Sequence, residues 1–114
     1  MSRTPQQRLQ DILEAIDAID RADVVLRAHD PGDEIALVAL DAIQYRIMTI
    51  GEAVKALPPS LRNDHPDVPW SDIARMRDLI GHHYYRLDAQ IVRATIQAPI
   101  AQLRATCQAA LDAG

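Results

Sequence analysis

One segment, residues 33–57, most constrains what this chain can fold into. Its apolar residues follow one another at alternating steps of four and three without a miss, at Ala36, Leu40, Ile43, Ile47, Ile50, Val54 and Leu57. These steps match the 3.6-residue turn of an α-helix and mark the seam along which a bundle helix packs. No segment alternates apolar and polar residues as a half-buried strand would. The sequence therefore predicts an all-α fold.

Proline-containing segments separate this helix from its neighbours. A first helix is predicted over residues 4–28, with Thr4 as its N-cap, and residues 29–33 reverse the chain with Pro and Gly. The consecutive prolines at 58–59 end the second helix. Two more prolines precede Trp70, so we expect an ordered loop that Trp70 anchors.

Two more helices complete the predicted fold. Ser71 is the expected N-cap of a third helix that runs through Ile80. Asp88 starts the last helix, in which Pro99 predicts a kink rather than an end. Cys107 lies on the apolar stripe of that helix and is expected to be a core residue. The elements together predict an antiparallel four- to five-helix bundle.

Size and charge limit the functions open to the chain. A length of 114 residues is the size of one domain, residues 1–114. The net charge of −4 has the wrong sign for a protein that coats nucleic acid, so any RNA contact is expected to be local. No apolar run approaches the roughly 20 residues that span a bilayer, and the first residues do not resemble a signal peptide. We expect a cytoplasmic protein without a membrane partner.

The residues best suited to chemistry gather in one short segment. It contains two guanidiniums, two imidazoles and two phenols, in Arg77, His82, His83, Tyr84, Tyr85 and Arg86. Metal-independent cleavage of RNA needs a base for the 2′-hydroxyl, an acid for the leaving 5′-oxygen and a cation for the phosphorane. Histidine serves either proton transfer, and arginine matches phosphate oxygens. The same residues also fit a structural cluster with interior tyrosines, in which Arg77 pairs with Asp78 or Asp88.

A single straight helix does not bring this set together. Arg77 and Tyr84 share a helical face with Ile73, whereas His82 lies about 140° from Arg77. Either Gly81 loosens the helix before the histidines, or two protomers face each other across a two-fold axis.

Other kinds of site are not expected. His82 and His83 are adjacent, so on a helix they point about 100° apart, and no further ligand stands at metal-binding spacing. The chain contains no phosphate-binding loop, nucleophile elbow or zinc-finger spacing. Gly51 in the second helix either permits close packing, which we favour, or lets Glu52 approach the site. We expect neither a metal nor a cofactor.

The order of residues from Trp70 to Asp88 resembles the signature of HepT-like proteins, which belong to the HEPN superfamily. In that signature an arginine, four residues, a histidine, one residue and a tyrosine are preceded by a Trp and a Met-Arg pair and followed by an aspartate. Arg77, His82 and Tyr84 fit without a gap. The resemblance extends over residues 5–112.

The resemblance implies both an activity and its control. It implies a two-fold homodimer with a metal-independent endoribonuclease cleft, in which Arg77 would hold the scissile phosphate of RNA and His82 would act as base or acid. It also implies the toxin of a type VII HepT/MntA-like toxin–antitoxin system. A cognate MntA-like nucleotidyltransferase antitoxin would inactivate it by transferring AMP to Tyr84. DNA is not an expected partner.

Two features keep alternatives open. Asp78 stands where many relatives have Asn, and its carboxylate could pair with Arg77 or His82 and weaken the nuclease. His83 and Tyr85 form a second, overlapping frame with Arg77. The alternative functions are a non-catalytic HEPN bundle that binds a nucleotide or scaffolds a nucleotidyltransferase, and a purely structural helical dimer.

Overall fold

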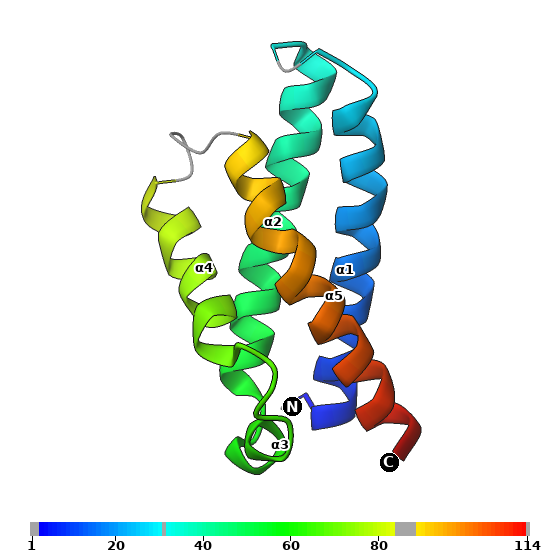
Figure 1. The fold of residues 1–114 in the computed structure, drawn as a ribbon, viewed down its shortest axis with the longest axis vertical. Helices are drawn as coiled ribbons and strands as arrows, with labels where there is room; N and C mark the ends of the chain where they lie inside the picture. Colours follow the sequence, from blue (N-terminus) through cyan, green and yellow to red (C-terminus); the bar gives the residue numbers. More distant parts are fainter. Residues whose placement is uncertain (1–2, 31, 84–88, 114) are drawn as a thin grey trace.

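Five helices make up the computed structural model (Figure 1). The structure describes the backbone of residues 3–30, 32–83 and 89–113, and the side chains of residues 3–30, 32–76 and 97–113. The helices are α1 (Pro5–Arg27), α2 (Glu34–Ala56), α3 (Pro59–Asp64), α4 (Trp70–His83) and α5 (Ala89–Ala113). The four long helices run alternately up and down, and the described ranges contain no strand. The predicted antiparallel bundle is confirmed, while its pairing into a dimer stays a prediction.

The start of α1 follows the predicted capping pattern. The Thr4 hydroxyl accepts a hydrogen bond from the Gln7 backbone N–H at 3.1 Å, and the Thr4 N–H donates to the Gln7 side chain at 2.9 Å. Pro5 occupies the first helical position, where its missing N–H costs nothing. This reciprocal arrangement satisfies donors that would otherwise be left open at the helix end.

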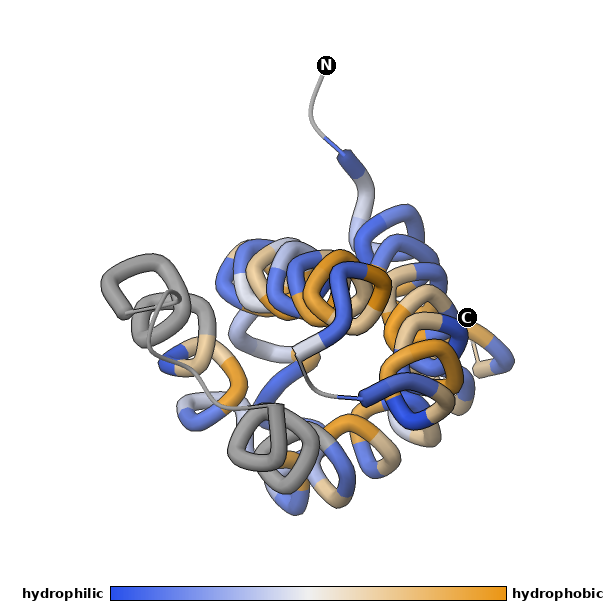
Figure 2. Tube along the Cα trace, turned by 90° about the horizontal axis from the view of Figure 1, so that it is seen from above, coloured by the Kyte–Doolittle hydropathy of each residue, from blue (hydrophilic) through white to orange (hydrophobic). Residues whose placement is uncertain are grey.

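The core lies mainly between α1 and α2. Of the seven predicted seam residues of α2, six are buried and the seventh, Leu40, is partly buried. Opposite them α1 contributes Ile12, Ile16 and Ile19, none more than 2 % exposed. Burying one such aliphatic side chain contributes roughly 1.5–3 kcal/mol. Figure 2 shows the helices arranged around a common interior.

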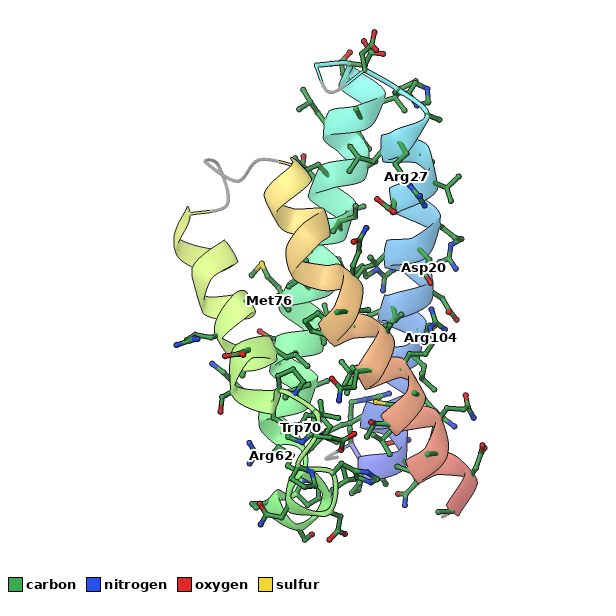
Figure 3. All side chains as sticks on the ribbon, viewed as in Figure 1. Asp20, Arg27, Arg62, Trp70, Met76 and Arg104 are labelled. Carbon is green, nitrogen blue, oxygen red and sulfur yellow. The ribbon has the colours of Figure 1, made fainter. Side chains whose placement is uncertain are left out.

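The segment between α2 and α4 differs from the prediction. Residues Pro59–Asp64 form the short helix α3, where we expected a loop. Proline ends a helix that precedes it, but its fixed φ also suits the first position of a new one. The predicted anchoring role of Trp70 is confirmed, because its indole N–H donates to the carbonyls of Arg62 at 3.1 Å and His65 at 2.9 Å (Figure 3).

The start of α4 also differs from the prediction. The helix begins at Trp70, so Ser71 lies inside the first turn and the prediction that it caps the helix is wrong. The Pro69 carbonyl accepts the first helical bond, from the Ile73 N–H at 3.0 Å. The bonds from the indole to Arg62 and His65 fix Trp70 in place, which explains why the helix starts two residues earlier than predicted.

α5 packs against α1 and is also tied to the segment before α4. It continues through Pro99, as predicted, while Asp88, its expected start, lies outside the described residues. Cys107 is fully buried, which confirms it as a core residue, and burial raises the pKa of its thiol to about 12. Gln102 donates to the Asp67 carbonyl at 2.5 Å. None of the described helices is long and apolar enough to cross a membrane.

Candidate functional site

Four of the six predicted site residues lie on the second half of α4. They are Arg77, Asp78, His82 and His83, and the structure describes their backbone as part of this helix. Tyr84 and Tyr85 lie outside the described residues. The geometry of the site is therefore argued from the helical register of α4.

The first half of α4 shows which side of the helix faces the core. Its buried residues are Trp70, Ile73 and Met76, which are 9 %, 0 % and 8 % exposed. Its exposed residues are Ser71, Asp72 and Arg75. Figure 3 shows Trp70 at the start of the helix and Met76 further along it. One side of α4 is thus used by the core, and the opposite side is turned outward.

This register extends to the predicted catalytic positions. Position 77 follows Ile73 by one turn and lies within the core-facing side, between Trp70 and Ile73 in angle around the axis. Position 82 follows Arg75 by two turns and lies on the outward side. Successive helical residues turn by 100° and rise by 1.5 Å, so positions 77 and 82 are about 140° apart around the axis and about 7.5 Å apart along it.

The regular helix bears on the two arrangements considered for the cluster. α4 continues without interruption through Gly81 to His83, so the arrangement in which Gly81 loosens the helix is not seen. The alternative frame, with His83 and Tyr85, does not bring a histidine position onto the face of position 77 either, because position 83 lies about 120° from it in the other direction. Within one chain neither histidine position shares a helical face with position 77. The arrangement with two protomers stays a prediction.

Charge is divided unevenly along the chain. Residues 1–72 contain seven basic and thirteen acidic residues, a net charge of −6, whereas residues 73–114 contain five basic and three acidic residues, a net charge of +2. All five of those basic residues are arginines, whose planar donors match phosphate oxygens. The acidic total therefore conceals a basic part that includes the predicted site.

Arg75 and Arg104 are the two arginines of this basic part whose side chains the structure describes. Arg104 on α5 donates to Asp17 at 2.7 Å and to Asp20 at 2.6 Å, both on α1 (Figure 3). The hydrogen bond to Asp17 is the largest cause of its raised pKa. Arg75 on α4 has an ion pair with Asp72 at 3.1 Å, in which the two side chains are 79 % and 67 % exposed.

Sequence reasoning missed the role of Arg104. Its partners precede it by 87 and 84 residues, and helical periodicity carries no signal over such separations. The acidic residues of α1 recur every third position, at Asp11, Glu14, Asp17, Asp20 and Asp23. This series was the signal available, because it predicts an acidic strip that a neighbouring helix can meet with an arginine.

Two surface hollows lie away from α4. One, between α1 and α5, is lined by residues that include Ile16, Ile100 and Arg104. The other, between α1 and α2, is lined by Arg8, Glu52 and other charged residues. Glu52 is one of the residues that line this hollow, while its approach to the cluster on α4 stays a prediction. Within the described ranges, no three His, Cys, Asp or Glu side chains are placed to hold a metal ion.

Comparison with known proteins places this arrangement in a family. The model of the family described as ribonuclease HepT-like matches residues 7–110. The chain belongs to the HepT-like ribonuclease family. The "Probable ribonuclease HepT" of Thermococcus cleftensis is 29 % identical to it over 106 residues, which cover 91 % of this chain and 93 % of the relative. No solved structure matches the chain.

A second HepT-like relative matches more closely over a shorter stretch. This protein of Caldanaerobacter subterraneus subsp. tengcongensis, whose name marks it as a candidate RNase, is 46 % identical over 54 residues. The matched part covers 47 % of this chain and 48 % of the relative. The predicted family and the predicted enzyme class, a ribonuclease, are confirmed, while the roles of single residues stay predictions.

Proposed function

We propose that this chain is a HepT-type toxin, a metal-independent endoribonuclease in which residues 1–114 act as a single domain. The match of the HepT-like family over residues 7–110 is the observation that carries the proposal. In the proposed site Arg77 holds the scissile phosphate and His82 acts as base or acid. His83 and Tyr85 are auxiliary candidates, and Asp78 adjusts the charge of the cluster.

The proposed reaction is an internal displacement at phosphorus. The base takes the proton of the 2′-hydroxyl, the 2′-oxygen bonds to phosphorus, and the bond from phosphorus to the 5′-oxygen breaks as the acid protonates that oxygen. The products are a 2′,3′-cyclic phosphate and a 5′-hydroxyl. An arginine stabilises the additional negative charge of the phosphorane.

We propose that a homodimer assembles this site. The 140° between positions 77 and 82 on an uninterrupted α4 supports it, because the arginine of one chain can meet the histidine of another across a two-fold axis. Each of the two equivalent sites would then take its arginine from one chain and its histidine from the other.

We further propose that a cognate MntA-like nucleotidyltransferase inactivates the toxin by transferring AMP to Tyr84. Tyr84 directly follows the last residue of α4, so AMP there adds negative charge beside the phosphate-binding arginine and repels RNA. Co-expression with the nucleotidyltransferase is expected to add whole AMP units to the intact mass. Tyr84→Phe should remove the addition and Tyr85→Phe should not; the reverse result would select the second frame.

The catalytic assignment is tested with His82→Ala. We expect RNA cleavage in vitro to fall about 10²- to 10⁴-fold and growth arrest to disappear, because a proton-transfer group is lost. His65→Ala is the matched control, since His65 lies before α4, at the end opposite position 82. Melting temperatures verify that both variants fold. Full cleavage by a folded His82→Ala variant would contradict the assignment.

A further inference from the structure

We propose that Arg75 binds a phosphate of the RNA strand beside the scissile phosphate, on the face of α4 that carries position 82. The inference rests on the proposed function and adds a substrate-binding residue to it. Arg75 lies outside the residues that the family resemblance assigns to the reaction.

The first argument is the register of α4. Positions 71, 75, 78 and 82 follow one another at steps of four, three and four, and so lie along one side of the helix. Positions 75 and 82 differ by only about 20° around the axis. Of the two arginine positions on the described part of α4, therefore, position 75 shares a face with position 82, whereas position 77 lies on the core-facing side.

The second argument is availability. The Arg75 side chain is 79 % exposed, and among the described side chains it forms one ion pair, with Asp72, which is itself 67 % exposed. An exposed pair at this spacing contributes little and is screened by salt, so a phosphate can displace the carboxylate. Arg104 differs, because two carboxylates at 2.7 and 2.6 Å already occupy its donors.

The third argument is the ligand. A guanidinium is always charged and presents planar donors that bind a phosphate oxygen pair in the way they bind a carboxylate. Residues 73–114, which include Arg75, have a net charge of +2, whereas residues 1–72 have −6, so the negative charge of the chain does not come from the segment that carries Arg75. An RNA strand fits these observations better than an acidic protein segment, because position 82 of the proposed ribonuclease lies on the same face.

The distance between the two positions predicts the kind of effect. Seven helical residues span about 10.5 Å, so Arg75 is too far from position 82 to act on the same phosphate. A contact to a neighbouring phosphate holds the strand before and during the reaction equally. It should therefore change KM and leave kcat nearly unchanged.

The test measures cleavage of a single-stranded RNA oligonucleotide by Arg75→Gln at several salt concentrations. We expect KM to rise about 3- to 10-fold, kcat to stay within about twofold, and the slope of log KM against log salt to fall by about 0.7, the value for one lost phosphate contact. Asp72→Asn, which frees the guanidinium, should lower KM. Arg27→Gln is the matched control, because Arg27 is 56 % exposed and paired with Asp23 on α1.

Several results would overturn the inference. An unchanged KM and salt slope in a folded Arg75→Gln variant would do so, as would an equal rise in KM for Arg27→Gln. A fall in kcat alone would assign Arg75 to positioning the reaction instead. Loss of binding to the nucleotidyltransferase with RNA kinetics intact would show that the ligand is a protein. If the wild type cleaves no RNA under any condition, it is the proposed function that fails.

Discussion

Between α1 and α5, Arg104 lies between two carboxylates at 2.7 and 2.6 Å. On the outward side of α4, Arg75 is paired, among the described side chains, with Asp72 alone, at 3.1 Å. Both guanidiniums are exposed to solvent, but their surroundings suit different roles. Two carboxylates within reach make Arg104 a link between helices. One weakly held carboxylate leaves Arg75 free to exchange partners, which is what binding of a substrate requires.

The largest expected effect tests the α4 side of this comparison. Arg77→Ala and His82→Ala should each abolish cleavage, but a mixture refolded together should recover about a quarter of the wild-type activity. Half of the random dimers then contain both variants, and one of their two sites is intact. The measurement is RNA cleavage before and after co-refolding. No recovery in verified mixed dimers would show that arginine and histidine act from the same chain.

A smaller effect is expected where α4 is attached to the rest of the molecule. Trp70→Phe should lower the free energy of unfolding by about 2–3 kcal/mol, because the carbonyls of Arg62 and His65 lose the indole donor, keeping one backbone donor each, and the smaller ring leaves a void. Urea unfolding measures the change. A loss below about 0.5 kcal/mol would show that the indole does not hold the start of α4.

On the α1–α5 side, stability should depend on alkaline pH through Cys107. The pKa of this thiol is raised to about 12 in the folded protein, while in the unfolded chain it is about 8.5. The neutral thiol therefore stabilises the fold fully below about pH 8.5, and this stabilisation is lost as pH rises toward 12. The wild type should lose about 2 kcal/mol more than Cys107→Ala between pH 8 and pH 10. Equal losses would contradict the burial of the thiol.

The smallest effect is expected at Arg104 itself. Arg104→Gln should cost less than about 1 kcal/mol of unfolding free energy, because the three side chains are 39–66 % exposed and solvent screens their attraction. RNA cleavage should stay unchanged. A change in KM as large as that expected for Arg75→Gln would show that Arg104, like Arg75, takes part in binding RNA.

Local sequence patterns predicted the long helices, and contacts between distant residues explain most of what they missed. The seam of α2 and the Thr4 cap are encoded in neighbouring residues, and both are confirmed. The start of α4 is not, because the indole of Trp70 binds carbonyls at the end of α3. The same holds for Arg104, whose two partners stand on another helix.

For the candidate site, the sequence supplies the register and the family but not the convergence of the side chains. Arg77 and His82 lie on α4, as the sequence predicts, and the family match supports the ribonuclease class. Helical spacing itself shows that positions 77 and 82 diverge in one chain. In the proposed dimer they meet through a second copy, and one chain's periodicity contains no information about that packing.

The uneven charge of the chain has a kinetic consequence. An RNA strand that approaches the carboxylates of α1 is repelled, while one that approaches the exposed guanidinium of Arg75 is attracted, so the orientation of an encounter affects its rate. Because the net charge of the chain is −4, we expect non-productive complexes with RNA to dissociate quickly. Association should therefore slow with added salt, while the lifetime of a correctly seated complex changes less.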